Sequence, residues 1–107
     1  DIRHIAVADN DGDVLITKMK QGKTNLKTPE DEQRYIFQLC QMRGMYDTTN
    51  ETLGVTEFAY TAREQIHQFV FYTQSNVVYL TCEKNMDDAK LLKIPKNVHQ
   101  IIKNYIE

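Results

Sequence analysis

The chain is poor in the residues that mark several protein classes: among its 107 residues it has no tryptophan, two cysteines, two prolines and four glycines. Two cysteines do not make a disulfide framework, so a reducing, cytoplasmic setting is the simpler interpretation. No run of about 18 apolar residues occurs, which predicts no direct membrane insertion. No signal peptide is recognisable at Asp1.

The chain also lacks an excess of charge of either sign. The net charge is −2 and the pI is about 5.9, with no basic stripe that would indicate nucleic-acid binding. Hydrophobic residues make up 41% and charged residues 26% of the chain, the balance of an ordinary globular domain. We therefore expect one domain that spans residues 1–107.

Motifs for cofactors and metals are missing too. Gly22-Lys23-Thr24 resembles the end of a phosphate-binding loop, but the earlier glycine that the loop requires would fall on Thr17. His4, His67 and His99 are too far apart for a local metal motif. The sequence therefore predicts no catalytic residue, no cofactor site and no metal ligand, and thus a protein that is not an enzyme.

Two further patterns could indicate a calcium site or a catalytic nucleophile. If Gly12 in the acidic segment 9–13 were the sixth residue of a calcium loop, the first and last ligands would be Val7 and Lys18. Neither side chain has an oxygen atom that could bind calcium. A β-hairpin turn is the favoured interpretation. His67 and Cys82 lie in neighbouring predicted strands, but no glycine elbow or oxyanion signal supports a nucleophile pair.

The apolar pattern predicts the element order β-β-α-β-β-β-α. An apolar hairpin, residues 5–8 and 14–17, comes first. A helix starts at Thr28-Pro29 and runs to about Arg43, with Gly44 as its stop. Strands follow over 56–62, 65–72 and 77–82, and an amphipathic helix ends the chain with Pro95 in its first turn. The fold class is α/β, an α+β sandwich with a five-stranded, mostly antiparallel sheet.

The first helix is apolar over more than half of its circumference, while a helix on a sheet needs an arc of about 100°. The excess lies around Phe37, Cys40 and Gly44. It requires a second covering surface, either a partner or a loop of the same chain.

The predicted strand 56–62 contains Phe58 and Tyr60 but no proline or inward lysine. If it lies at the edge of the sheet, it lacks the usual defences against pairing with another strand. We name Phe37, Cys40, Gly44, Phe58 and Tyr60 as the predicted protein interface.

The hairpin over residues 4–16, with its Asp11-Gly12 turn, resembles the opening hairpin of Roadblock-type dynein light-chain domains. Within that family the resemblance points to the MEK-binding scaffold subunits of Ragulator, the late endosomal and lysosomal adaptor complex. Leu53-Gly54-Val55, three strands and a final amphipathic helix continue the pattern. Family members often begin with a helix, which has no counterpart before this hairpin, and the loop 47–52 looks long.

The resemblance implies a Roadblock/profilin-like sheet in which the first and fifth strands are central. The third strand would lie at an edge and pair with the same strand of another Roadblock-type subunit, helix beside helix. The implied function is a scaffold that supports Rag-type small GTPases, TOR signalling and MAP kinase signalling through the kinase MEK, at the cytosolic face of late endosomes and lysosomes. The alternatives are a longin-like trafficking module that regulates a small GTPase, and a ligand sensor or enzyme with a buried pocket.

Overall fold

The structure is a computed structural model that describes residues 2–22 and 28–105. The predicted element order is confirmed, with one addition, a single-turn helix α2 inside the segment that the sequence analysis treated as a polar loop. The elements are β1 (Ile2–Asp9), β2 (Val14–Met19), α1 (Pro29–Asp47), α2 (Asn50–Leu53), β3 (Phe58–Ala62), β4 (Ile66–Tyr72), β5 (Asn76–Glu83) and α3 (Asp88–Tyr105).

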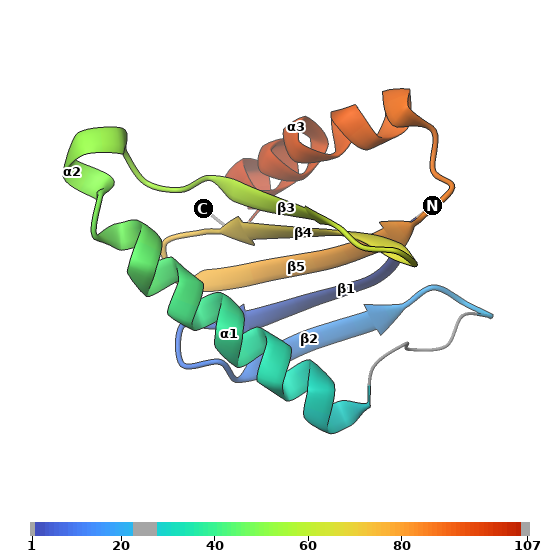
Figure 1. The fold of residues 1–107 in the computed structure, drawn as a ribbon, viewed down its shortest axis with the longest axis horizontal. Coiled ribbons are helices and arrows are strands. Elements are labelled where there is room, and N and C mark those ends of the chain that lie inside the picture. The colour runs from blue at the N-terminus through green and yellow to red at the C-terminus, as the bar shows by residue number, and fades with distance from the viewer. Residues whose placement is uncertain (1, 23–27, 106–107) are drawn as a thin grey trace.

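The five strands form one sheet in the order β2-β1-β5-β4-β3 (Figure 1). Every neighbouring pair is antiparallel. β1 and β5 are interior strands and β3 is an edge strand, as the resemblance implied. β2 forms the opposite edge, so the sheet ends in two strands with one free side each.

α1 and α3 cover opposite faces of the sheet. Alternate residues of a strand point to opposite sides, so apolar residues on both sides of these strands need a covering helix. Val78, Leu80 and Cys82 of β5 pack in one core cluster with Ile94 and Ile102 of α3. Val77 and Tyr79, the alternate residues, pack in a second cluster with Leu39 of α1. Figure 1 shows α1 in front of the sheet and α3 behind it. The result is a three-layer sandwich.

The acidic segment between β1 and β2 is a hairpin turn, as predicted. Asp9 Oδ1 accepts hydrogen bonds from the backbone N–H groups of Asp11 and Asp13, at 3.0 and 2.9 Å. Gly12 has φ 92°, in the left-handed region that glycine enters at little cost. These side chains therefore hold the turn itself.

Helix α1 begins as predicted but ends later. Thr28 Oγ1 accepts from Asp31 N–H at 3.1 Å, and Pro29 occupies the first turn. The predicted stop at Gly44 is wrong, since the helix continues to Asp47. The ring of Tyr46, beyond the glycine, packs edge-on against Tyr72 with centroids 6.1 Å apart, and this contact stabilises the last turn against the weak helix preference of glycine.

Helix α3 begins earlier than predicted, at Asp88, so Pro95 lies inside the helix and not in its first turn. A proline there removes one backbone hydrogen bond. The helix persists because Ile94 and Ile102 are buried against the sheet. Ile101, which the sequence places on the same apolar stripe, is 54% exposed.

Arg43 fixes the second half of α1 to the sheet. Its Nη1 donates to Asn10 Oδ1 at 2.8 Å and to the carbonyl of Asn76 at 3.2 Å, and its Nη2 donates to the carbonyl of Thr73. The guanidinium also lies over the ring of Tyr72. One side chain thus joins α1 to both turns at this end of the sheet.

We expect Arg43→Met to lower the free energy of unfolding by about 2 kcal/mol, because it removes the charged donor to the partly buried carbonyl of Thr73 and the contact with the ring of Tyr72. Arg34→Met is the matched control. Arg34 is exposed and pairs with Asp31, three residues earlier, at 3.2 Å, so its loss should cost about 0.3 kcal/mol. Urea unfolding followed by circular dichroism gives both values. Equal losses would show that Arg43 does not hold the helix.

Candidate functional site

The two edges of the sheet differ in how they resist pairing with another strand. In β2, Val7 pairs with Ile16 but Ala8 pairs with Val14, so Leu15 is an extra residue at a β-bulge. Lys18 stands exposed on the same strand. Bulges and lysines are common edge defences. β3 pairs with β4 in unbroken register, and its five residues, Phe-Ala-Tyr-Thr-Ala, carry no charge. β3 is therefore the edge open to pairing.

The register shows which backbone groups of β3 are free. Arg63 N–H donates to the carbonyl of Ile66, and Tyr72 N–H donates to the carbonyl of Glu57, so positions 57 and 63 bond inward to β4. Antiparallel pairs alternate between bonded and non-bonded. Positions 59 and 61 therefore also bond inward, while the N–H and C=O groups of Phe58, Tyr60 and Ala62 point out of the sheet.

The side chains of Phe58 and Tyr60 form an aromatic row along this edge, on the α3 side. The ring of Phe58 stacks on Phe71 at 5.7 Å between centroids, and Tyr60 lies 4.9 Å from Phe69. The two rings nevertheless remain 40% and 43% exposed. Exposed aromatic rings beside free backbone donors are what a docking strand buries.

The hydroxyl of Tyr60 lies 2.6 Å from His67 Nδ1, and His67 Nε2 lies 3.2 Å from the carbonyl of Lys84. Both ring nitrogens of His67 are thereby engaged. Cys82 pairs across the sheet with His67, but it is fully buried, and burial raises the pKa of its thiol to about 11. The arrangement fixes Tyr60 and engages both nitrogens of the imidazole that lies opposite Cys82.

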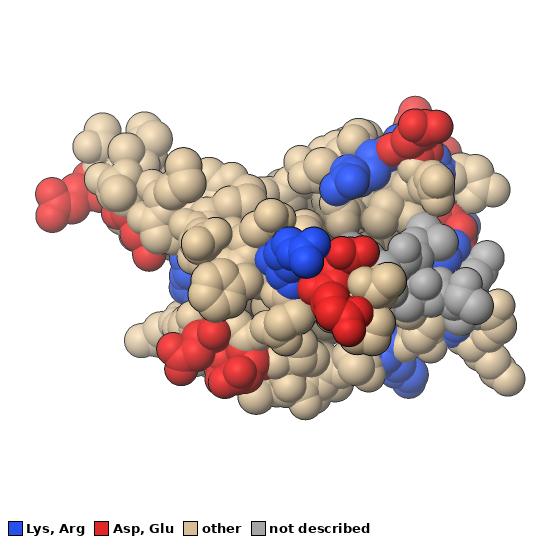
Figure 2. Space-filling view, turned by 60° about the horizontal axis from the view of Figure 1, so that its bottom comes forward, with Lys and Arg blue, Asp and Glu red and all other residues tan. Residues whose placement is uncertain are grey.

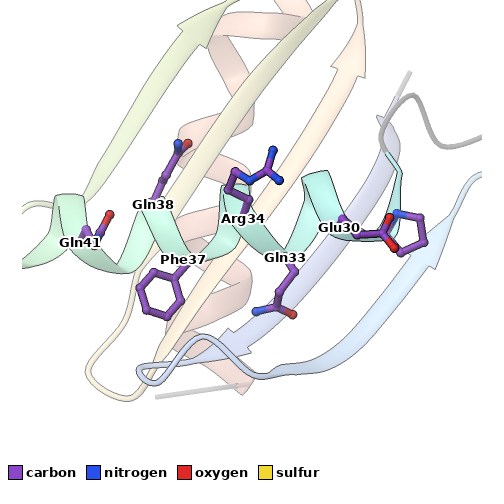
Figure 3. A pocket seen from close by; sticks show the side chains of 7 residues that line it. Glu30, Gln33, Arg34, Phe37, Gln38 and Gln41 are labelled. Atoms are coloured by element: carbon purple, nitrogen blue, oxygen red, sulfur yellow. The ribbon is translucent and has the colours of Figure 1, made fainter.

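The outer surface of α1 carries the predicted residue Phe37, whose side chain is 54% exposed. Its ring lies over the β1–β2 turn, since a β-carbon at Gly12 would be 3.7 Å from Phe37 Cδ2. Gln33 Nε2 on the same flank donates to the carbonyl of Gly12 at 3.1 Å. Figure 3 shows Phe37 and Gln33 on one side of the helix, with Gln38 and Arg34 on the other. These four side chains help to line an open groove of about 660 Å³.

The predicted residues Cys40 and Gly44 lie on that same flank of the helix. Cys40 is half-buried, with its sulfur 3.9 Å from the carbonyl of Asp9, and burial together with the charge of Asp9 raises the pKa of its thiol. The loop of the same chain thus covers much of Cys40, one of the two possibilities left open above. A side chain at Gly44 would meet nothing within 4 Å.

The five predicted residues therefore do not form one surface. Phe58 and Tyr60 border β3, while Phe37, Cys40 and Gly44 face the β1–β2 turn at the other side of α1. At 100° per residue, the flank of α1 that faces β3 carries Gln38, Met42 and Met45. Met45 is 72% exposed. Sequence reasoning did not name Met45, because no local pattern shows which flank of the helix faces β3.

We expect Gly44→Ala to raise the free energy of unfolding by about 1 kcal/mol, because an interior helical glycine costs that much and the site has room for a methyl group. Thermal unfolding at low protein concentration measures it. If stability instead falls, Gly44 is needed for the fold of the chain alone and the open surface seen here is not its environment.

No group of three or more His, Cys, Asp or Glu in residues 2–22 and 28–105 is placed to hold a metal. Within the same residues no helix has the length and apolarity to cross a bilayer. Figure 2 shows one face on which charges form small separate groups between wide uncharged areas, without a basic stripe.

No family model and no curated protein matches the chain. The fold, however, matches solved structures over most of the chain. The gliding protein MglB from Thermus thermophilus superposes with a TM-score of 0.70 at 13% identity, over 90% of this chain and 70% of that one. A Roadblock/LC7 domain from Streptomyces avermitilis gives 0.66 at 10% identity, over 98% and 85%.

A profilin from Schizosaccharomyces pombe gives a TM-score of 0.63 at 13% identity, over 96% of this chain and 86% of that one. At these identities the likeness concerns the fold alone. The chain thus has the fold shared by Roadblock-type domains and profilin, which confirms the predicted fold class.

Proposed function

We propose that the chain is a non-enzymatic docking subunit that pairs with a second Roadblock-type domain through β3. The observation that carries the proposal is the undefended edge, with the outward N–H and C=O groups of Phe58, Tyr60 and Ala62 beside two half-exposed aromatic rings. A partner strand there would continue the sheet, and a partner helix would lie beside the Met45 flank of α1.

A continuous sheet across two domains would be a rigid platform, and the pair would act on small GTPases. Support for this step is the resemblance of the opening hairpin to Roadblock-type domains together with the shared fold. The finer form of the proposal is a Ragulator-type heterodimer that recruits Rag-type GTPases and MEK at the cytosolic face of late endosomes and lysosomes. Its membrane attachment would come from a partner.

The experiment is light scattering of the purified chain, alone and after co-expression with tagged Roadblock-type domains. A stable one-to-one complex, or a dimer of the chain itself, is the expected result. Pull-down of a Rag-type GTPase by the pair but not by the single chain would support the finer proposal. A chain that remains monomeric with every such domain would contradict the pairing.

A further inference from the structure

Two charged residues of opposite sign flank the open edge strand β3. Glu57 precedes the strand and Arg63 follows it, and both side chains are exposed. Neither forms an ion pair with another of the described residues. Between them lie the five uncharged residues of β3, at the free edge of the sheet (Figure 1). This edge therefore has one negative end and one positive end.

Both charges lie on the α1 side of the sheet. Ala59 of β3 packs against the core cluster that contains Leu39 of α1. Because side chains alternate along a strand, positions 57, 61 and 63 share that side. The position of Arg63 agrees: burial raises the pKa of Tyr35 of α1 to about 12, and the nearby charge of Arg63 opposes that rise. A partner strand at this edge would therefore meet both charges on the same side.

The backbone of β3 restricts how a second copy of the same strand could pair with it. Phe58, Tyr60 and Ala62 direct their N–H and C=O groups outward, and an antiparallel neighbour forms bonded pairs only with such residues. A register centred on Tyr60 uses all three, because Tyr60 lies opposite Tyr60 and Phe58 lies opposite Ala62 of the second copy. A shift by two residues leaves one of the three outside the paired strands.

The flanking charges favour that same register. With Tyr60 at the centre, Glu57 lies opposite Arg63 of the second copy, and Arg63 lies opposite Glu57. Both positions bond inward to β4, so each is part of a non-bonded pair of the new ladder, with Cα atoms about 4.5 Å apart. Opposite charges across such a pair are stabilising and like charges are destabilising. The shifted registers place Glu57 opposite Thr61 or Gln65, and a parallel strand would bring like charges together.

The uncharged side chains are also compatible with this register. On the α3 side, the half-exposed ring of Phe58 lies beside the small side chain of Ala62 of the second copy. On the α1 side, Ala59 lies opposite Thr61, and these small side chains leave room for the two α1 helices. Strand β3 with its two flanking residues is thus complementary to itself in bonding, charge and size.

We propose that Glu57 and Arg63 select the strand that docks on β3, and that the occupant they fit is a second copy of this chain, antiparallel and centred on Tyr60. The inference rests on the proposed pairing through β3 and adds its partner and its register. A different Roadblock-type domain would displace the second copy only if its strand carried a basic residue opposite Glu57 and an acidic residue opposite Arg63.

A charge exchange in the full chain tests this selection. Glu57→Arg and Arg63→Glu each place like charges opposite one another at both ends of the pair, so the dissociation constant of self-association should rise about 30-fold. An equimolar mixture of the two variants should associate within about threefold of the native chain, because each supplies the charges that the other requires. Sedimentation velocity over a concentration series measures association, and native mass spectrometry distinguishes mixed pairs from self pairs.

Glu64→Arg is the matched control. Glu64 is exposed and adjacent to Arg63, but in this register it lies opposite Thr56 of the second copy. Its reversal should change the dissociation constant by less than about twofold. Restored association in the mixture also shows that both single variants are folded.

Single variants that self-associate as tightly as the native chain, or a mixture that stays dissociated, would overturn the proposal. So would a native chain that is monomeric alone but pairs with another Roadblock-type domain. If Ala62→Pro blocks that complex, the proposed pairing through β3 still holds and only the second copy and its register are wrong. If Ala62→Pro weakens no complex, the pairing through β3 is itself contradicted.

Discussion

Ala62→Pro should strongly weaken association through β3 while the chain stays folded. The N–H of Ala62 points out of the sheet, so proline removes a donor that only a partner strand would use, and its ring obstructs the approaching backbone. We expect the dissociation constant of the pair to rise about 100-fold, which corresponds to about 2.7 kcal/mol. Sedimentation velocity over a concentration series measures the change.

Thr61→Pro is the matched variant one residue earlier. The N–H of Thr61 bonds inward to β4, so the same substitution should destabilise the isolated chain, by about 3 kcal/mol. Ala62→Ser controls for the loss of alanine. If Ala62→Pro and Thr61→Pro unfold the chain equally, the register of β3 is wrong. If Ala62→Pro pairs as well as the native chain, pairing does not use this edge.

Leu39→Ala should strongly lower the stability of the chain, because α1 is held on the sheet by few buried side chains. Only Ile36 and Leu39 of this helix are buried, and Leu39 packs against Ala6, Val70 and Val77. Truncation leaves a cavity between helix and sheet, so we expect the free energy of unfolding to fall by about 3 kcal/mol. The flank that carries Met45 would become mobile, and pairing should weaken as well.

Leu92→Ala is the control for Leu39→Ala. Leu92 is 80% exposed on α3, so its truncation should change stability by less than about 0.5 kcal/mol. Chemical denaturation of both variants gives the comparison. Similar small losses in both would mean that α1 is not anchored through Leu39.

Much of the fold was predictable because its signals are local. Thr28-Pro29 marks a helix start whose capping bond forms within four residues, and the Asp11-Gly12 turn requires only its own backbone. The two boundary errors concern Gly44 and Pro95. Both residues are weak helix formers, and in both cases distant contacts stabilise the helix: Tyr46 against Tyr72, and Ile94 and Ile102 against the sheet.

The candidate site was predictable in part for the same reason. The aromatic edge of β3 is visible in five consecutive residues, so Phe58 and Tyr60 could be named from the sequence. Which flank of α1 accompanies that edge depends on how the helix crosses the sheet, and no local pattern specifies the crossing. Phe37 stays a predicted contact for a partner that reaches the groove beside the β1–β2 turn, and Met45 is the residue that lies toward β3.

The most direct test of the central claim is amide hydrogen exchange along β3, in the chain alone and with a pairing partner. Alone, the amides of Ala59 and Thr61 should exchange slowly and those of Phe58, Tyr60 and Ala62 rapidly, because only the former bond to β4. In the pair, the three rapid amides should become protected. If a complex forms and these amides still exchange as fast as in the chain alone, the partner binds elsewhere and β3 is not the docking edge.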